Sequence, residues 1–228
     1  MLTKTKGIVL RTFKYADNKC LTHILTPEHG KITYAVYAPQ SKRSKVHSNM
    51  LQPLSLLEII AEHKPNRTIQ QIKEARVLTT GVYIIKDPTR TAMAMFIAET
   101  TDACVYEEHI DSSLFLKLEN ILKYLDSEQT MDSHFALRFL IELSDSLGFN
   151  PTYDSESIIL GSYLNSIELV NNRHLFLKFV DACKSGDINI FSHTERQTLL
   201  RLLLGYFRYN LPDMPEIKSV EVLEEIFS

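Results

Sequence analysis

The sequence is poor in the residues and motifs that most catalytic and metal sites require. Its seven glycines are scattered, so it contains no Gly-rich phosphate-binding loop. Neither the Gly-x-Ser-x-Gly elbow of many hydrolases nor the His-Glu-x-x-His motif of metalloproteases occurs. The three cysteines are far apart and odd in number, which excludes a Cys-x-x-Cys metal pair and favours free thiols in a reducing compartment. We therefore expect no catalytic residue, no bound metal and no cofactor.

Long hydrophobic runs are missing as well. No stretch approaches the ~20 apolar residues of a membrane-spanning helix. Residues 1–15 lack the uninterrupted apolar segment of a secretory signal peptide. At 228 residues, of which 44% are hydrophobic, the chain is long enough to bury a core in one large domain or two small ones. We expect a cytoplasmic protein without a membrane partner.

Charge is divided unequally along the chain. Residues 1–80 contain 13 Lys and Arg against 5 Asp and Glu, a net charge of +8 that the overall value of −3 hides. Residues 81–228 contain 12 Lys and Arg against 23 Asp and Glu, a net charge of −11. Two halves of opposite charge indicate two units with different partners, and the basic half suits a polyanion.

The first 80 residues show the alternation that is typical of β-strands. Five segments rich in β-branched and aromatic residues are separated by turns such as Pro27-Glu28-His29-Gly30. The predicted strands are Thr3–Tyr15, Cys20–Thr26, Lys31–Ala38, Leu51–Glu62 and Thr68–Leu78. Five strands with one long loop in about 80 residues fit a small Greek-key barrel of the OB-fold class.

A basic loop connects the third predicted strand to the fourth. It carries Lys42, Arg43 and Lys45, and no acidic residue lies between Lys31 and Pro53. Three cations on a mobile tether between two anchored strands could follow a phosphate backbone. The alternative is an ordinary polar surface loop, and the charge of this one loop, taken alone, favours that interpretation. The positive charge of the whole first third shifts the balance toward nucleic acid.

Aromatic residues alternate with cations on the predicted strands, as on barrels that hold single strands by base stacking and backbone contacts. Tyr34 is in phase with Ile32 and Val36, which favours a core position, whereas Tyr37 is in phase with Lys31 and could be exposed or buried. The candidate nucleic-acid-binding residues are Lys6, Arg11, Lys14, Lys31, Tyr37, Lys42, Arg43, Lys45 and Arg67.

After Pro88 the apolar residues follow helical spacing. Thr89 or Thr91 is expected to cap a first helix, a second starts near Ser112, and a third runs from an N-cap at Asp132 to a stop at Gly148. The expected buried faces are Met93, Ile97, Thr100 and Cys104, then Leu114, Leu118, Ile121, Leu122 and Leu125, then Phe135, Phe139, Leu140, Leu143 and Leu147. Periodic apolar residues of this kind are far more often core than a cofactor site.

The segment around residues 150–192 is the least patterned part, and Ile167–Phe179 fits either a hairpin or a helix. Ser192 and Glu195 form a capping box before another helix, and Ser219 is expected to cap a short last helix. The sequence therefore predicts an α+β chain. A five-stranded OB-fold β-barrel in residues 1–80 is followed by a mainly α-helical domain in residues 81–228.

Several short motifs follow one another in a recognisable order. They are Lys6-Gly7-Ile8-Val9-Leu10-Arg11-Thr12, Tyr15-Ala16-Asp17, Leu25-Thr26-Pro27-Glu28-His29-Gly30-Lys31, Leu51-Gln52-Pro53-Leu54, Arg138-Phe139, Leu147-Gly148-Phe149-Asn150-Pro151 and the closing segment Ser219–Phe227. In this order they resemble the RecO family of DNA repair proteins. The similarity spans the whole chain and is strongest in residues 6–60.

The resemblance implies a recombination mediator that catalyses no reaction. It implies binding to single- and double-stranded DNA, annealing of complementary strands, and contact with the acidic tail of single-stranded DNA-binding protein. It also implies cooperation with RecR in loading RecA onto gapped DNA, and hence a place in the cytoplasm at the nucleoid. Lys6, Arg11 and Lys31 occupy matching DNA-binding positions, and Lys42, Arg43 and Lys45 match the family's basic loop by location and charge.

Arg138 matches a helical-domain arginine near the surface that receives the partner's tail. A cation beside an apolar pocket suits an acidic, aromatic-ended peptide. An ion pair within the domain is an equally compatible alternative.

One departure from the family concerns zinc, because many members carry a four-cysteine zinc module after the Leu-Gly-Phe segment. Residues 152–192 contain only Cys183, so we expect zinc to be absent.

Charge and composition alone leave a second function open, in which the barrel belongs to an RNA-binding adaptor protein. Competition between single-stranded DNA and RNA of equal length would separate the two. A hydrolase or nuclease is supported by no motif.

Overall fold

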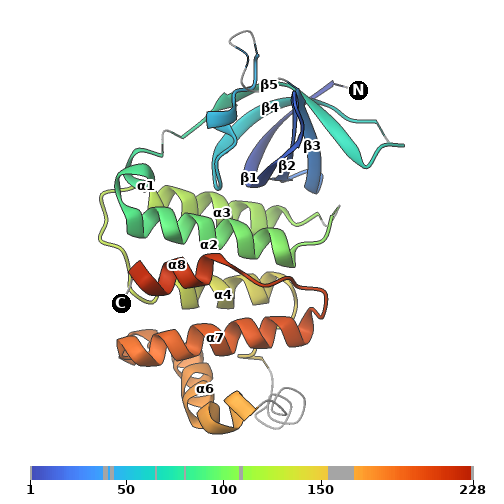
Figure 1. Ribbon diagram of the computed structural model, residues 1–228. Coiled ribbons are helices and arrows are strands. Elements are labelled where there is room, and N and C mark those ends of the chain that lie inside the picture. The colour runs from blue at the N-terminus through green and yellow to red at the C-terminus, as the bar shows by residue number, and fades with distance from the viewer. Residues whose placement is uncertain are drawn as a thin grey trace. The chain divides into compact units, whose positions relative to one another are not determined.

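The computed structural model describes residues 2–37, 41, 44–64, 66–79, 81–107, 110–153 and 167–226. The chain forms two compact units, one of Met1–Thr130 with Ile217–Phe227 and one of Met131–Glu216 (Figure 1). The first unit contains every strand and also several helices, so the compact units are not divided where strands give way to helices. The domain boundary near residue 80 stays a prediction.

The strands close into the five-stranded barrel that the sequence predicts. They are β1 (Leu2–Ala16), β2 (Lys19–Thr26), β3 (Gly30–Tyr37), β4 (Leu56–Glu62) and β5 (Ile69–Val77), joined in the order β1-β2-β3-β5-β4. The β3–β5 pair is parallel and the other pairs are antiparallel. This crossed order is that of a Greek-key barrel of the OB-fold class.

Alternation along the strands fills the barrel with apolar side chains, among them Val9, Ile24, Leu57 and Ile59. Tyr34 is completely buried among them, as predicted, and its hydroxyl lies 2.9 Å from Nε2 of His63. Gly7 has no room for a side chain, because a Cβ there would lie 2.5 Å from Cγ2 of Ile24. The glycine of the Lys6-Gly7 motif is thus explained by close packing inside the barrel.

The fourth strand begins at Leu56, so the predicted start at Leu51 was wrong. A β-turn with Pro53 and Leu54 at its centre precedes it, closed by a hydrogen bond from Ser55 N–H to the carbonyl oxygen of Gln52 (3.0 Å). Leu54 has a φ of +59°. Proline followed by a residue with positive φ is the requirement of a type II turn, which interrupts the extended chain.

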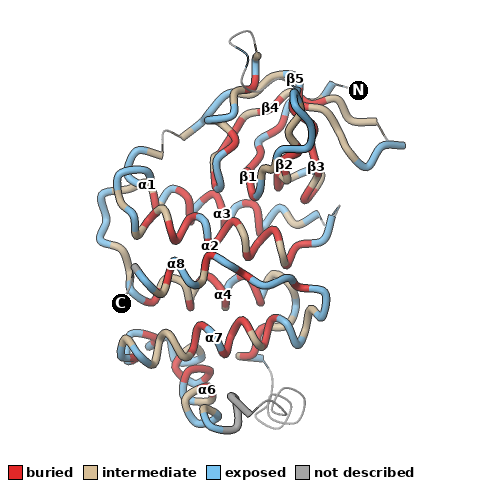
Figure 2. Tube along the Cα trace, viewed as in Figure 1, coloured by how far each residue is buried: buried red, intermediate tan, exposed pale blue. Residues whose placement is uncertain are grey.

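The helices of the first unit are α1 (Val82–Lys86), α2 (Pro88–Cys104), α3 (Ser112–Leu125) and α8 (Ser219–Ile226). Helix α2 packs against α1, α3, α8 and β1. Figure 2 shows it buried along most of its length, which fits its apolar residues on all sides. The predicted buried faces of α2 and α3 are confirmed, including Met93, Ile97, Leu118 and Leu122.

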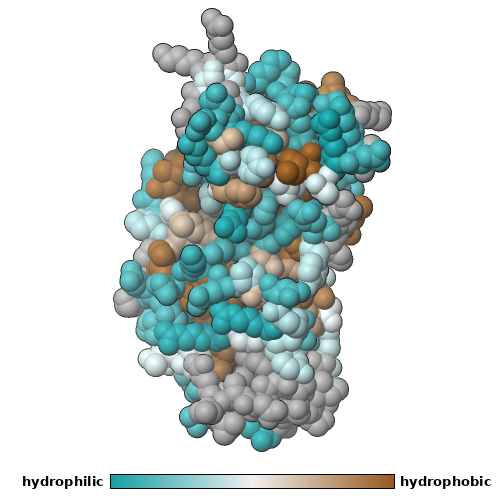
Figure 3. Space-filling model, turned by 45° about the vertical axis from the view of Figure 1, so that its right-hand side comes forward, coloured by the Kyte–Doolittle hydropathy of each residue, from teal (hydrophilic) through white to brown (hydrophobic). Residues whose placement is uncertain are grey.

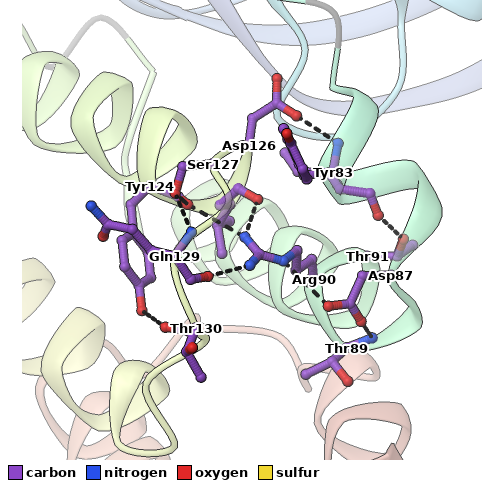
Figure 4. A network of polar contacts seen from close by, with 12 residues as sticks. Tyr83, Asp87, Thr89, Arg90, Thr91, Tyr124, Asp126, Ser127, Gln129 and Thr130 are labelled. Carbon is purple, nitrogen blue, oxygen red and sulfur yellow. Dashed lines mark hydrogen bonds and ion pairs between the residues drawn. The ribbon is translucent and has the colours of Figure 1, made fainter.

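Two of the predicted caps in this unit were wrong. Helix α2 is capped by Asp87, whose side chain accepts a hydrogen bond from Thr89 N–H (2.9 Å), and not by Thr89 or Thr91. Helix α8 begins at Ser219, but its first N–H groups are bound by the carboxylate of Glu99 on α2. The C-terminal end of α3 depends on Arg90, whose buried guanidinium binds the main-chain oxygen of Leu125, the last residue of the helix, and that of Gln129 beyond it (Figure 4).

The second unit contains α4 (Phe135–Ser146), α6 (Ile167–Ser185), α7 (His193–Asn210) and a short 3-10 helix at Ile188–Ile190. The helical alternative for Ile167–Phe179 is therefore the correct one. The capping box of Ser192 and Glu195 is confirmed. Helix α4 starts at Phe135, three residues after the predicted N-cap, because the Asp132 side chain accepts from His134 N–H in a preceding turn.

The three cysteines are free, and burial raises the pKa of Cys104 and of Cys183 to about 12. Within the described ranges, no helix combines the length and apolar character needed to cross a membrane.

Candidate nucleic-acid interface

The candidate residues lie on several parts of the barrel. Lys6, Arg11 and Lys14 are on β1, Lys31 and Tyr37 on β3, Lys45 between β3 and β4, and Arg67 between β4 and β5. Lys42 and Arg43 lie outside the described residues. The six residue-to-residue steps from Lys31 to Tyr37 span about 20 Å of extended chain, so the two ends of β3 belong to different surroundings.

Lys31 is buried at the junction of β3 with α2. Its Nζ donates to the main-chain oxygen of Asp102 (2.6 Å) and lies 3.6 Å from the Oδ1 of the same residue, which is also 2.6 Å from Nδ1 of His23. Burial alone would raise the pKa of Asp102. The hydrogen bond with His23 and the charges of Lys31 and Arg11 outweigh it and hold that pKa below its usual value. Lys31 therefore joins the barrel to α2 and does not lie on the open surface.

Lys6 makes a second contact between the barrel and the helices. Its Nζ lies 3.0 Å from Oε1 of Glu119 on α3, and Nζ of Lys123 lies 3.4 Å from the same oxygen. The hydrogen bond from Lys6 is the main reason why the pKa of Glu119 is lowered. The side chain of Lys6 is still 48% exposed, so it is paired but accessible. Lys45, in the loop, pairs with Glu74 of β5.

The remaining described cations are more open. Lys14 has a side chain 73% exposed and lies 3.7 Å from Asp17, and Arg67 is exposed in its turn. Arg11 is exposed, with its guanidinium 5.8 Å from the ring centre of Phe13. It also lines a cavity of about 510 Å³ beside α2 and α8. These weakly paired residues keep positive charge available to a polyanion.

One group of side chains was recognised from the sequence only in part, because Tyr37 was a candidate and Lys19 was not. Tyr15 is 62% exposed and Tyr37 54% exposed, and Nζ of Lys19 lies 4.8 Å and 5.5 Å from their ring centres. The register explains this, because Lys19 pairs with Ala16 on one side and with Tyr37 on the other. The predicted strands Thr3–Tyr15 and Cys20–Thr26 leave Ala16–Lys19 as the turn between them, so hairpin pairing could have placed Lys19 opposite the end of β1. The exposed alternative for Tyr37 is the one observed.

The face of the molecule seen in Figure 3 is largely hydrophilic where it is coloured, with scattered hydrophobic residues. Within the described ranges, no three His, Cys, Asp or Glu residues are grouped so that they could hold a metal ion. The arrangement offers charge and aromatic surface for binding.

Arg138 lies on α4 in the second unit, with its side chain 39% exposed. Its Nε donates to Oδ2 of Asp132 (2.8 Å) and its Nη2 donates to Oδ1 of Asn189 (2.9 Å). Ile190, next to Asn189 in the chain, is 48% exposed. The arginine is thus held by an ion pair within its unit and still reaches the surface beside an apolar residue.

Comparison with known proteins gives matches along the whole chain. The family model described as "Recombination protein O N terminal" matches residues 1–80, and the one described as "Recombination protein O C terminal" matches residues 85–159. Curated proteins named "DNA repair protein RecO" are similar over 100% of both chains. They include those of Phocaeicola vulgatus (34% identical), Bacteroides fragilis (32%) and Flavobacterium psychrophilum (31%).

Proposed function

Because this chain belongs to the RecO family of DNA repair proteins, which mediate recombination and catalyse no reaction, we propose that its barrel binds single- and double-stranded DNA and anneals complementary strands. The observation that carries this proposal is the closed barrel with exposed cations and aromatic rings on β1, β2 and β3. Rings for base stacking and cations for the backbone are what such barrels use on single strands. Membership of a DNA repair family favours DNA over the RNA-binding alternative.

The proposed DNA contacts are Arg11, Lys14, Tyr37 and Arg67, which are exposed, together with Lys42 and Arg43 of the basic loop. Lys6 and Lys45 join them, since each is paired with one carboxylate and remains accessible. Lys31 is left out, because its buried ammonium is held by Asp102.

The proposed partners are RecR, the acidic tail of single-stranded DNA-binding protein and, indirectly, RecA, in the cytoplasm at the nucleoid. Arg138 is the proposed contact for the acidic tail. In this proposal a carboxylate of the tail takes the place of Asp132 on the guanidinium, and an aromatic side chain covers Ile190.

Annealing of complementary DNA strands coated with single-stranded DNA-binding protein tests both halves of the proposal. We expect the chain to accelerate annealing, and to do so much less when the coating protein lacks its acidic tail. The naked strands serve as the control, on which the presence of the tail should make no difference. Failure to anneal naked strands would contradict the assignment of the barrel.

The role of Arg138 is tested by binding of a peptide with the sequence of that tail. Arg138→Ala should weaken peptide binding by about 1.5–3 kcal/mol, the range for a hydrogen bond to a charged group. Arg208→Ala, an exposed arginine on α7, is the matched control. If Arg138→Ala binds the peptide like the unaltered protein, Arg138 has only its structural pair with Asp132.

A further inference from the structure

Two exposed tyrosines and a half-buried lysine form a cluster at one end of the barrel, referred to here as the tyrosine platform: Tyr15, Lys19 and Tyr37. They come from three strands that pair side by side, with Lys19 at the start of β2 between the ends of β1 and β3. Strand pairing places Lys19 directly beside Tyr37, whereas Tyr15 lies at the irregularity in register between Lys14 and Ala16.

The two tyrosines of the platform are more than half exposed, whereas Tyr34 of the same barrel is fully buried. Lys19 lies over both rings, and within the described ranges no carboxylate is within ion-pair distance of its ammonium. Lys6, Lys31 and Lys45, by contrast, all have a carboxylate partner. Two open rings and one uncompensated cation are thus gathered in one place.

We propose that the tyrosine platform is a stacking site for unpaired bases of single-stranded DNA. This inference rests on the proposed function of the barrel and adds to it a subsite and its ligand. Every unpaired base has a π-face that can stack on a tyrosine, whereas the bases of a duplex are already stacked on one another. Charge identifies the occupant, because Lys19 and the exposed Lys14 nearby on β1 suit a strand whose backbone is anionic.

Lys19 has two roles in this arrangement. Its cation–π contacts hold the two rings in place, and its charge attracts the phosphate beside a stacked base. The acidic Asp17 lies in the turn that connects β1 to β2, with its Oδ1 3.7 Å from Nζ of Lys14. Lys19 is therefore one of the cations that should count in the salt dependence of binding at this site.

The experiment compares three oligonucleotides of equal length: an oligo-dT, an abasic strand with the same phosphates, and a duplex. Tyr15→Ala with Tyr37→Ala should weaken binding to oligo-dT at least about fivefold, the lower end for loss of one stacked base. Binding to the abasic strand and to the duplex should change less than twofold. The slope of log Kd against log salt should stay the same, because no phosphate contact is lost.

Three further variants make the result specific. Tyr15→Phe with Tyr37→Phe keeps both rings and should bind oligo-dT as the unaltered protein does. Lys19→Gln should lower the salt slope by about 0.7, the value for one phosphate on a single strand. Tyr106→Ala removes another exposed tyrosine of the same unit, 61% exposed, and should have no effect. Circular dichroism of each variant checks that the barrel is folded.

The outcomes separate this inference from the proposed function. If the double alanine variant is folded and binds oligo-dT as tightly as the unaltered protein, the platform is not a stacking site, while DNA binding by the barrel stands. Equal losses of affinity for oligo-dT and for the abasic strand would also overturn it, because the contribution of the rings to binding would then not depend on bases. If the unaltered protein binds none of the three oligonucleotides, the proposed function fails together with the inference.

Discussion

The ammonium nitrogen of Lys31 donates a hydrogen bond of 2.6 Å to the main-chain oxygen of Asp102. Asp102 lies in the last turn of α2, where carbonyl groups lack partners within the helix and the helix dipole is negative. A cation from β3 thus caps a helix from another part of the chain. A lysine whose charge and strand position suggested a DNA contact is instead part of the junction between barrel and helix.

Replacing Lys31 should therefore affect stability and not DNA binding. Lys31→Met leaves Asp102 buried without the ammonium group of Lys31. We therefore expect the free energy of unfolding of the first unit to fall by about 3 kcal/mol. The salt slope of DNA binding should not change, because no phosphate contact is lost. Urea denaturation and a salt titration of DNA affinity measure the two effects.

Lys14→Met is the matched control, since Lys14 is on β1 of the same barrel and its side chain is 73% exposed. It should leave stability within about 0.5 kcal/mol and lower the salt slope on single strands by about 0.7. A Lys31→Met protein with full stability and a reduced slope would reverse the two assignments.

Local patterns predicted much of this fold. Strand alternation gave the five strands and the burial of Tyr34, and helical spacing gave the buried faces of α2 and α3. These features depend on neighbours in the chain, which a single sequence contains. The predicted start of β4 was wrong because Pro53 and the positive φ of Leu54 turn the chain before the strand. Of these two features, only the proline can be seen in the sequence.

The contacts of the candidate site depend on distant residues and could not be predicted in this way. Alternation distinguishes the inside of a barrel from the outside, but not which part of the outside is covered by helices. Lys31 and Lys6 point outward and meet Asp102 and Glu119, which are 71 and 113 residues away in the sequence. Tyr15 and Lys19, by contrast, lie together because of the local hairpin between β1 and β2.

The cap of α8 gives a second prediction. Glu99 accepts hydrogen bonds from Lys218 N–H (3.2 Å) and Ser219 N–H (2.8 Å), whereas the buried hydroxyl of Ser219 has no hydrogen-bond partner among the described residues. Glu99→Ala should lower the free energy of unfolding by about 1–2 kcal/mol, as for loss of an N-cap with its charge. Ser219→Ala should change it by less than about 0.5 kcal/mol.

Thermal unfolding of the two variants side by side measures this difference. The result would contradict the structure if Ser219→Ala were the more damaging change, because the serine would then be the cap that the sequence suggested.

The half-buried His63 makes stability depend on pH. Burial lowers the pKa of His63, and the positive charge of His29, whose ring centre is 4.4 Å away, lowers it further. The folded state therefore favours the neutral ring, which lies 2.9 Å from the hydroxyl of Tyr34. Its contribution to stability is complete above the unfolded pKa of about 6.5 and is lost as the pH falls through the lower folded value.

We expect the melting temperature to fall as the pH is lowered from about 7.5 to about 5, and His63→Gln to flatten that part of the profile. His174→Gln, an exposed histidine on α6, is the control and should follow the unaltered protein. A steep decline that persists in His63→Gln would show that another group is responsible.

Arg90 gives the strongest prediction for stability, because one buried side chain binds several main-chain oxygens (Figure 4). Its Nη1 donates to the carbonyl oxygen of Leu125 (2.7 Å) at the C-terminal end of α3, its Nη2 to Gln129, and its Nε to the Asp87 carboxylate (3.2 Å). Arg90→Met should therefore lower the free energy of unfolding by about 3 kcal/mol, because carbonyl groups are left buried without a donor.

Arg90→Lys should recover less than half of this loss. A guanidinium presents five donors in a fixed plane, whereas a single ammonium cannot reach Leu125, Gln129 and Asp87 together. Arg208→Met, on the exposed face of α7, controls for loss of an arginine and should cost less than about 0.5 kcal/mol. If lysine restored full stability in urea denaturation, one positive charge would suffice at this position and the fork of hydrogen bonds would be dispensable.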